Sequence, residues 1–257
     1  MSTLAKTASI AAIVVTALMA APFDASAATH VGATFTPGTG NSCNGSPDFE
    51  WLQTGRASGP SYATPSAGVL TVWSFQADDA VQTVMTLRVF RPTATAHQYQ
   101  VIADGSELQT IPASSGLHNF PTRVPVNAGD IIGIRSTSGE CGVSTLNPGD
   151  TFDFNTGTAT AIGALGNFTP NLPSNGWIVD ISATLEPDVD KDGFGDESQD
   201  QCLEQAGTNN GCPVPSPPAV SPPAAPPSQP VTKKKCKKHK HHSAFPAKKK
   251  RCKKKKH

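Results

Sequence analysis

The sequence lacks the motifs of the common enzyme classes. Its 257 residues contain no G-x-S-x-G nucleophile elbow, no H-E-x-x-H metal motif and no glycine-rich phosphate loop. The histidines that precede the C-terminal tail are isolated from one another, at His30, His97 and His118. We therefore predict a protein that is not an enzyme, and we keep a secreted hydrolase with an unrecognised site as the less favoured alternative.

A helical repeat of apolar residues is also missing. Apolar and polar residues instead alternate with a period of two, as in residues 84–91 and 177–185, which is typical of half-buried strands. Residues 69–75 are apolar on both faces and predict a central strand. Further strands are expected at 31–36, 49–52, 98–103, 124–126 and 131–135. Residues 28–186 thus predict one all-β domain, a β-sandwich, with a β-barrel as the alternative.

One segment of this domain carries a family resemblance. Residues 124–134 read Val-Pro-Val-Asn-Ala-Gly-Asp-Ile-Ile-Gly-Ile. The segment resembles the strand–turn–strand of jelly-roll modules in secreted proteins, where a Gly-Asp turn joins two strands of the sandwich. The resemblance implies a jelly-roll-like β-sandwich and says nothing about its ligand.

Long hydrophobic runs are absent after the N-terminus. Residues 10–21 form an apolar run behind a short positive segment, and Ala25-Ser26-Ala27 has the small-x-small pattern of a cleavage site. We predict that residues 1–27 are a signal peptide, with an uncleaved anchor as the alternative. No later segment is apolar enough to cross a membrane. The expected localisation is therefore secreted, extracellular or cell-wall associated, without a transmembrane segment.

The cysteines are few and even in number. In an exported protein an even count favours disulfides over metal thiolates. The composition of the segments favours three local pairs, and pairing between chains through the tail remains the alternative. The expected pairs are Cys43 with Cys141, Cys202 with Cys212, and Cys236 with Cys252.

Carboxylates are concentrated directly after the last expected strand. Residues 188–202 read Asp-Val-Asp-Lys-Asp-Gly-Phe-Gly-Asp-Glu-Ser-Gln-Asp-Gln-Cys. Carboxylates so close together repel one another unless a cation lies between them. Oxygen ligands at alternating positions, followed by a glycine that permits a sharp turn, predict a calcium loop, with a solvated acidic linker as the alternative.

The D-x-D-x-D-G pattern, a fourth aspartate and a downstream Asp-x-Cys resemble a thrombospondin type 3 calcium repeat over residues 188–212, and more loosely an EF-hand loop. The expected calcium-loop segment is residues 187–212. The resemblance implies Ca²⁺ held by Asp188, Asp190, Asp192, the Phe194 carbonyl, Asp196 and Asp200. Position twelve of the pattern is Gln199, so the final ligand stays open between Asp200, Glu197 and the Gln199 amide.

Proline separates this loop from the end of the chain. Residues 213–232 hold nine prolines among Ala, Ser and Val. Proline fixes φ and removes a hydrogen-bond donor, so we expect a semi-rigid polyproline II linker, in which the eighteen residues 213–230 would span roughly 55 Å. The calcium loop would then connect the last strand to the linker, and bound calcium would make this connection rigid.

Acidic residues are absent from the tail, residues 233–257, which contains fourteen of the twenty-one Lys and Arg. Residues 28–232 hold six basic and nineteen acidic residues, a formal charge of −13, so the tail is a separate electrostatic object. We expect a disordered tail that binds cell-wall or extracellular polyanions. The binding residues would be Lys233, Lys234, Lys235, Lys237, Lys238, Lys248, Lys249, Lys250, Arg251, Lys253 and Lys254.

The tail offers no stacking platform beyond Phe245, so sequence-specific nucleic-acid binding is not expected. It resembles the Lys/Cys-rich ends of secreted proteins from high-GC bacteria. A solubilising tail without a fixed partner is the alternative. The tail histidines would add charge as pH falls, with transition-metal binding less favoured.

Together these features predict a secreted, calcium-binding cell-surface or matrix protein that displays a β-sandwich on a stalk. The alternative is a carbohydrate-binding module of the cell envelope that binds polysaccharide. Of the aromatic residues, Trp51 and Tyr62 lie near expected loops and are the candidates for a sugar platform.

Overall fold

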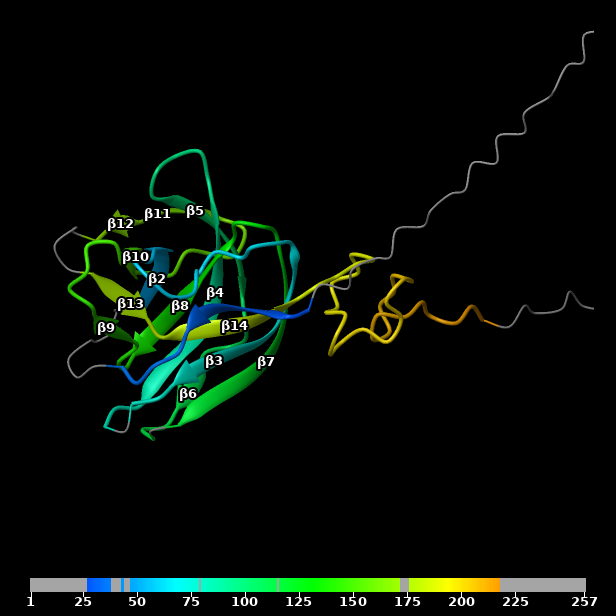
Figure 1. The fold of residues 1–257 in the computed structure, drawn as a ribbon, viewed down its shortest axis with the longest axis horizontal. Coiled ribbons are helices and arrows are strands. Elements are labelled where there is room, and N and C mark those ends of the chain that lie inside the picture. The colour runs from blue at the N-terminus through cyan, green and yellow to red at the C-terminus, as the bar shows by residue number, and fades with distance from the viewer. Residues whose placement is uncertain are drawn as a thin grey trace, which may run out of the picture. The chain divides into compact units, whose positions relative to one another are not determined.

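A computed structural model of the chain confirms an all-β sandwich (Figure 1). The structure describes residues 27–37, 43, 47–78, 80–114, 116–171 and 176–217. These residues form strands, turns and bends, and none of them lies in a helix. Accordingly, this part of the chain holds no helix long and apolar enough to cross a membrane. The sandwich and the acidic loop belong to one compact unit that ends at Pro215.

The smaller sheet has four antiparallel strands in the order β1-β14-β3-β7. Its strands are β1 (Thr29–Ala33), β14 (Ile181–Glu186), β3 (Gly68–Gln76) and β7 (Leu117–Val126). β3 lies between β14 and β7, which confirms the central strand expected over residues 69–75. β1 is an edge strand and pairs with β14 alone, with Thr29 opposite Leu185.

The larger sheet has the order β11-β5-β4-β8-β2-β10-β12, and β6 also pairs with β4. Its strands are β2 (Asp48–Gly55), β4 (Thr83–Pro92), β5 (Gln98–Asp104), β6 (Gln109–Ile111), β8 (Ile131–Ser138), β10 (Thr151–Gly157), β11 (Leu165–Asn167) and β12 (Thr169–Pro170). Only Phe168 separates β11 from β12, although these strands pair with opposite ends of the sheet. The sheet therefore curls until its ends meet, close to a barrel.

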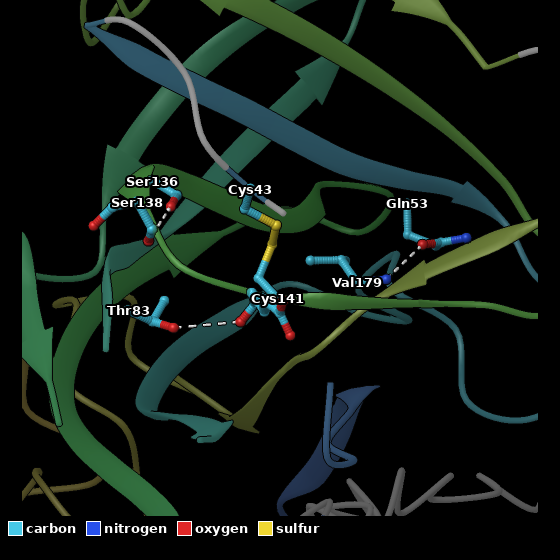
Figure 2. Close-up of a disulfide and its surroundings, with 8 residues drawn as sticks. Cys43, Gln53, Thr83, Ser136, Ser138, Cys141 and Val179 are labelled. Atoms are coloured by element: carbon cyan, nitrogen blue, oxygen red, sulfur yellow. Dashed lines mark hydrogen bonds between the residues drawn. A yellow bond between two sulfur atoms is a disulfide. The ribbon is translucent and has the colours of Figure 1, made fainter. Parts of the chain in front are cut away.

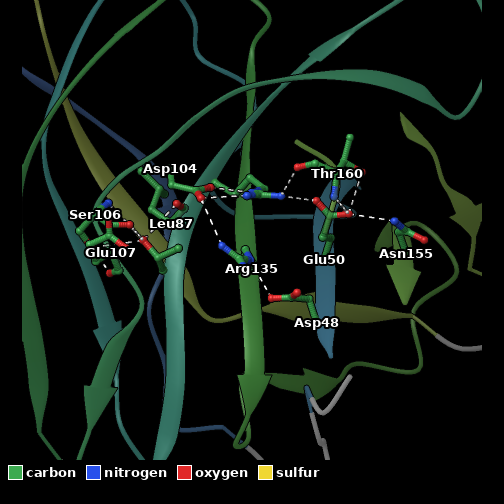
Figure 3. Close-up of polar contacts among 11 residues, drawn as sticks. Asp48, Glu50, Leu87, Asp104, Ser106, Glu107, Arg135, Asn155 and Thr160 are labelled. Carbon is green, nitrogen blue, oxygen red and sulfur yellow. Dashed lines mark hydrogen bonds and ion pairs between the residues drawn. The ribbon is translucent and has the colours of Figure 1, made fainter. Parts of the chain in front are cut away.

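Charged side chains of the larger sheet form one buried ion-pair cluster. Arg88 of β4 is 2% exposed and bonds Glu50 of β2, which is 1% exposed, and both oxygens of Asp104 on β5. Figure 3 shows this cluster, in which the Glu50 carboxylate also accepts from Asn155 and Thr160. Arg88 lies opposite the apolar face of β4, as the alternation predicts. Its burial is explained by the covering segment that carries Thr160.

Two of the three expected disulfides are confirmed. Cys43 is bonded to Cys141 within the sandwich (Figure 2), and Cys202 is bonded to Cys212 in the acidic loop. The first bond joins residues 98 positions apart, beside the backbone of Val179, whose N–H donates to Gln53. The third pair, Cys236 with Cys252, lies outside the described residues.

The strand expected over residues 177–185 is interrupted at Asp180. β13 (Trp177–Val179) pairs with β9 (Gly142–Ser144) in a separate two-stranded sheet, and β14 begins at Ile181. The alternation had placed Asp180 on a polar face, but its side chain is buried. Its two oxygens accept the backbone N–H groups of Phe35 and Gln76 at 3.0 Å each. Burial raises the pKa of Asp180 to about 9.

Replacement of Asp180 by Asn should therefore change how stability depends on pH. The folded-state pKa lies above the ordinary 3.8, so the contribution of Asp180 is complete below pH 4 and is lost as pH rises towards 9. Urea unfolding should show a wild-type free energy of unfolding that falls by up to roughly 1.4 kcal/mol per pH unit in this window, relative to the variant. Parallel profiles for the two proteins would contradict the assignment of this buried acid.

Candidate metal site

The acidic loop begins directly after β14, and its first three aspartates converge. One carboxylate oxygen from each of Asp188, Asp190 and Asp192 lies within 4.8 Å of the others. Lys191 and Gly193 adopt positive φ angles of 61° and 86°, and these bring the alternating side chains to one side. The structure thus places the three residues together, as the spacing predicts.

Backbone N–H groups hold these carboxylates in place. The amides of Asp192 and Gly193 donate to the two oxygens of Asp188 at 3.1 and 3.0 Å. The amides of Phe194 and Gly207 donate to the two oxygens of Asp192 at 2.9 and 3.0 Å. The hydrogen bond from Gly207 comes from inside the loop that the Cys202–Cys212 disulfide closes, so this loop packs against the acidic segment.

Asp196 and Asp200 act on the same cluster through their charges. Burial, followed by the charges of Asp192, Asp200 and Asp188, raises the pKa of Asp190. Burial, followed by the charges of Asp188, Asp200 and Asp190, raises the pKa of Asp196. The charges of neighbouring aspartates therefore disfavour the ionised forms of Asp190 and Asp196, so the five residues are electrostatically connected.

Two carboxylate oxygens of the cluster are buried without a partner. Among the described residues, Oδ2 of Asp190 and Oδ2 of Asp200 are inaccessible and accept no hydrogen bond. A buried carboxylate oxygen without a hydrogen bond or a cation is costly. These two atoms therefore fit a cation that the loop would hold.

The three candidates for the final ligand differ in their surroundings. Glu197 accepts the backbone N–H of Ala28 at 2.5 Å. The side chain of Gln199 donates to the Thr122 carbonyl at 2.7 Å and accepts from the Gly195 amide at 3.5 Å. Of the three, Asp200 has the buried, unpartnered oxygen.

Glycine is required beside Asp200. A Cβ atom at Gly211 would lie 1.7 Å from Oδ1 of Asp200, and the residue has φ of +80°. Only glycine combines this backbone conformation with so close an approach. The short loop closed by Cys202 and Cys212 is therefore shaped to cover the carboxylates.

The side chain of Phe194 contacts the sandwich. Its ring lies 4.1 Å from the guanidinium carbon of Arg123 on β7, a cation–π contact. Only the backbone carbonyl of Phe194 is expected to bind the metal, so the ring contact is an additional anchor of the loop to the sandwich.

Glu186, the last residue of β14, fastens the loop to the sandwich and was missed by the sequence analysis. Its carboxylate accepts from the Thr71 hydroxyl at 2.8 Å, the Ser198 hydroxyl at 2.6 Å and the amides of Ser198 and Glu197 at 2.9 and 3.0 Å. Burial alone would raise the pKa of Glu186, but the hydrogen bonds led by those of Ser198 and Thr71 lower it. The loop is thus docked on β3 and β14.

The candidate sugar platform is not supported. Trp51 and Tyr62 are each 2% exposed, and the Tyr62 hydroxyl donates to the Val179 carbonyl. Both side chains belong to the core, so neither offers a face to a polysaccharide. Trp51 is covered by the small β9–β13 sheet, where a Cβ atom at Gly142 would lie 2.6 Å from its ring. The candidate polyanion-binding residues from Lys233 to Lys254 lie outside the described residues.

Comparisons with family models, curated proteins and solved structures find no match to this chain.

The substitution Glu186→Gln should loosen the docked loop. It removes the charge that four donors share, and we expect a loss of about 1–3 kcal/mol in the free energy of unfolding at neutral pH. The pKa of Glu186 lies below its ordinary 4.5, so this difference should shrink as pH falls below 4. Denaturant unfolding of Glu186→Gln and of the exposed control Glu204→Gln measures it. Equal stability of the two variants would exclude an anchoring role.

Proposed function

We propose that this chain is a secreted, calcium-binding, non-enzymatic protein that displays a β-sandwich on a proline-rich stalk. Its polycationic tail retains it at a cell surface or in a matrix. The observation that carries the proposal is the docked acidic loop, in which five aspartates interact and two of their oxygens are buried without a partner.

Calcium suits this set of oxygens better than magnesium. Ca²⁺ accepts about six to eight oxygen ligands in a flexible geometry, whereas Mg²⁺ demands a near-ideal octahedron and usually keeps several waters. Oxygens of Asp188, Asp190 and Asp192 lie within 4.8 Å of one another. Asp196, Asp200 and the Phe194 carbonyl are the further candidate ligands, and oxygen-only, acid-rich sites are typical of calcium.

Export is supported by the covalent structure. Two disulfides within the described residues belong to an oxidising compartment. The signal-peptide pattern of residues 1–27 supports the same conclusion. The linker then separates the sandwich from a tail that has fourteen positive charges and no acid.

The calcium site is tested by isothermal titration of the mature chain with CaCl₂. We expect saturable binding to the wild type and at least roughly tenfold weaker binding to Asp190→Asn, because one buried ligand oxygen and one charge change. Glu204→Gln, a charge loss at an exposed position of the same loop, should bind like the wild type. Absence of binding at millimolar calcium, or equal binding by Asp190→Asn, would refute the site.

Retention by the tail is tested by deleting residues 233–257. The full chain should sediment with cells or envelope fragments at low salt and leave them progressively as the salt concentration increases, because its attraction to polyanions is electrostatic. The deleted chain should remain in the medium under all conditions. A deleted chain that still sediments would place the attachment in the sandwich instead.

A further inference from the structure

The N-terminal end of β1 lies against the acidic loop. The backbone nitrogen of Ala28, one residue before β1, donates to Oε1 of Glu197 at 2.5 Å. The register of β1 explains this position, because Thr29 is opposite Leu185, next to the point where β14 continues into the loop. In the described chain, no lysine or arginine forms an ion pair with Glu197.

Ala28 is also the residue that follows the small-x-small cleavage pattern Ala25-Ser26-Ala27. Cleavage after Ala27 converts the Ala28 amide nitrogen into an α-ammonium group. We propose that the exported chain begins at Ala28 and that this α-ammonium forms an ion pair with Glu197, which fastens β1 to the acidic loop. The inference rests on the export of the chain, as proposed above.

The chemistry of the position favours an ammonium over an amide. An amide supplies one N–H, whereas an α-ammonium supplies three and carries a positive charge at neutral pH. The carboxylates around it are Glu197, Glu186, which accepts the Glu197 amide, and Asp188, which lines the same hollow as Ala27 and Thr29. His30 is the basic side chain nearest in sequence and is exposed. A positive charge at Ala28 therefore lies near carboxylates of the acidic loop, although this loop also carries the exposed Lys191.

The consequence concerns the edge of the smaller sheet. β1 pairs with β14 alone, so its N-terminal end is held by that ladder and by the contact at Glu197. In the uncleaved chain the same nitrogen is a neutral donor and the ion pair is absent. Signal-peptide removal would thus complete the attachment of β1. Cleavage one residue earlier or later would move the α-ammonium away from the position of the Ala28 nitrogen.

The experiment first identifies the N-terminus of the exported protein by mass spectrometry. It then compares two purified chains, one that begins at Ala28 and one extended by Gly-Ser before Ala28. Each is made with Glu197 and with Glu197→Gln, and Glu107→Gln serves as an exposed control on the sandwich. Amide hydrogen exchange of Thr29–Ala33 is the measurement, with EDTA and with calcium.

The exported chain should begin at Ala28. Glu197→Gln should accelerate exchange in β1 about two- to fivefold in the chain that begins at Ala28, the range expected for an exposed ion pair. The same substitution should have little effect in the extended chain. A different N-terminus, or equal effects of Glu197→Gln in both chains, would overturn the inference. If the expected pattern appears in EDTA while titration detects no calcium binding, only the calcium proposal fails.

Discussion

The repulsion among five aspartates in one short loop is the constraint on which the rest of this region depends. Backbone amides satisfy Asp188 and Asp192, but buried oxygens of Asp190 and Asp200 are left without partners. The backbone donors therefore hold the cluster together, and the two unpartnered oxygens are the atoms proposed to bind a cation. Positive φ at Lys191 and the absence of a Cβ atom at Gly211 serve the same arrangement.

The acidic loop packs against the sandwich through several side chains, so it is more than a connection between the last strand and the linker. Glu186 ends the last strand and receives donors from the far side of the loop, while Arg123 covers the Phe194 ring. Calcium binding would consequently stabilise the contacts of the loop with β3, β7 and β14, since these strands hold it.

Alternation, cysteine chemistry and the spacing of the aspartates predicted the fold class, the central strand β3, two disulfides and the convergence of Asp188, Asp190 and Asp192. These features depend on residues close together in sequence or on simple counting. The burial of Arg88 and Trp51 could not be predicted, because the covering segments come from distant parts of the chain. Glu186 was missed for the same reason. A single acid at the end of a strand does not indicate an anchoring role in the sequence, because its donors reach it only when the loop folds back.

A crystal structure of residues 28–217 grown with calcium tests the central claim most directly. Anomalous scattering should locate Ca²⁺ among Asp188, Asp190 and Asp192, with Oδ2 of Asp190 and Oδ2 of Asp200 bound to calcium and bonds of about 2.4 Å. An acidic loop that adopts the same conformation without an ion, or an ion held elsewhere, would contradict the account.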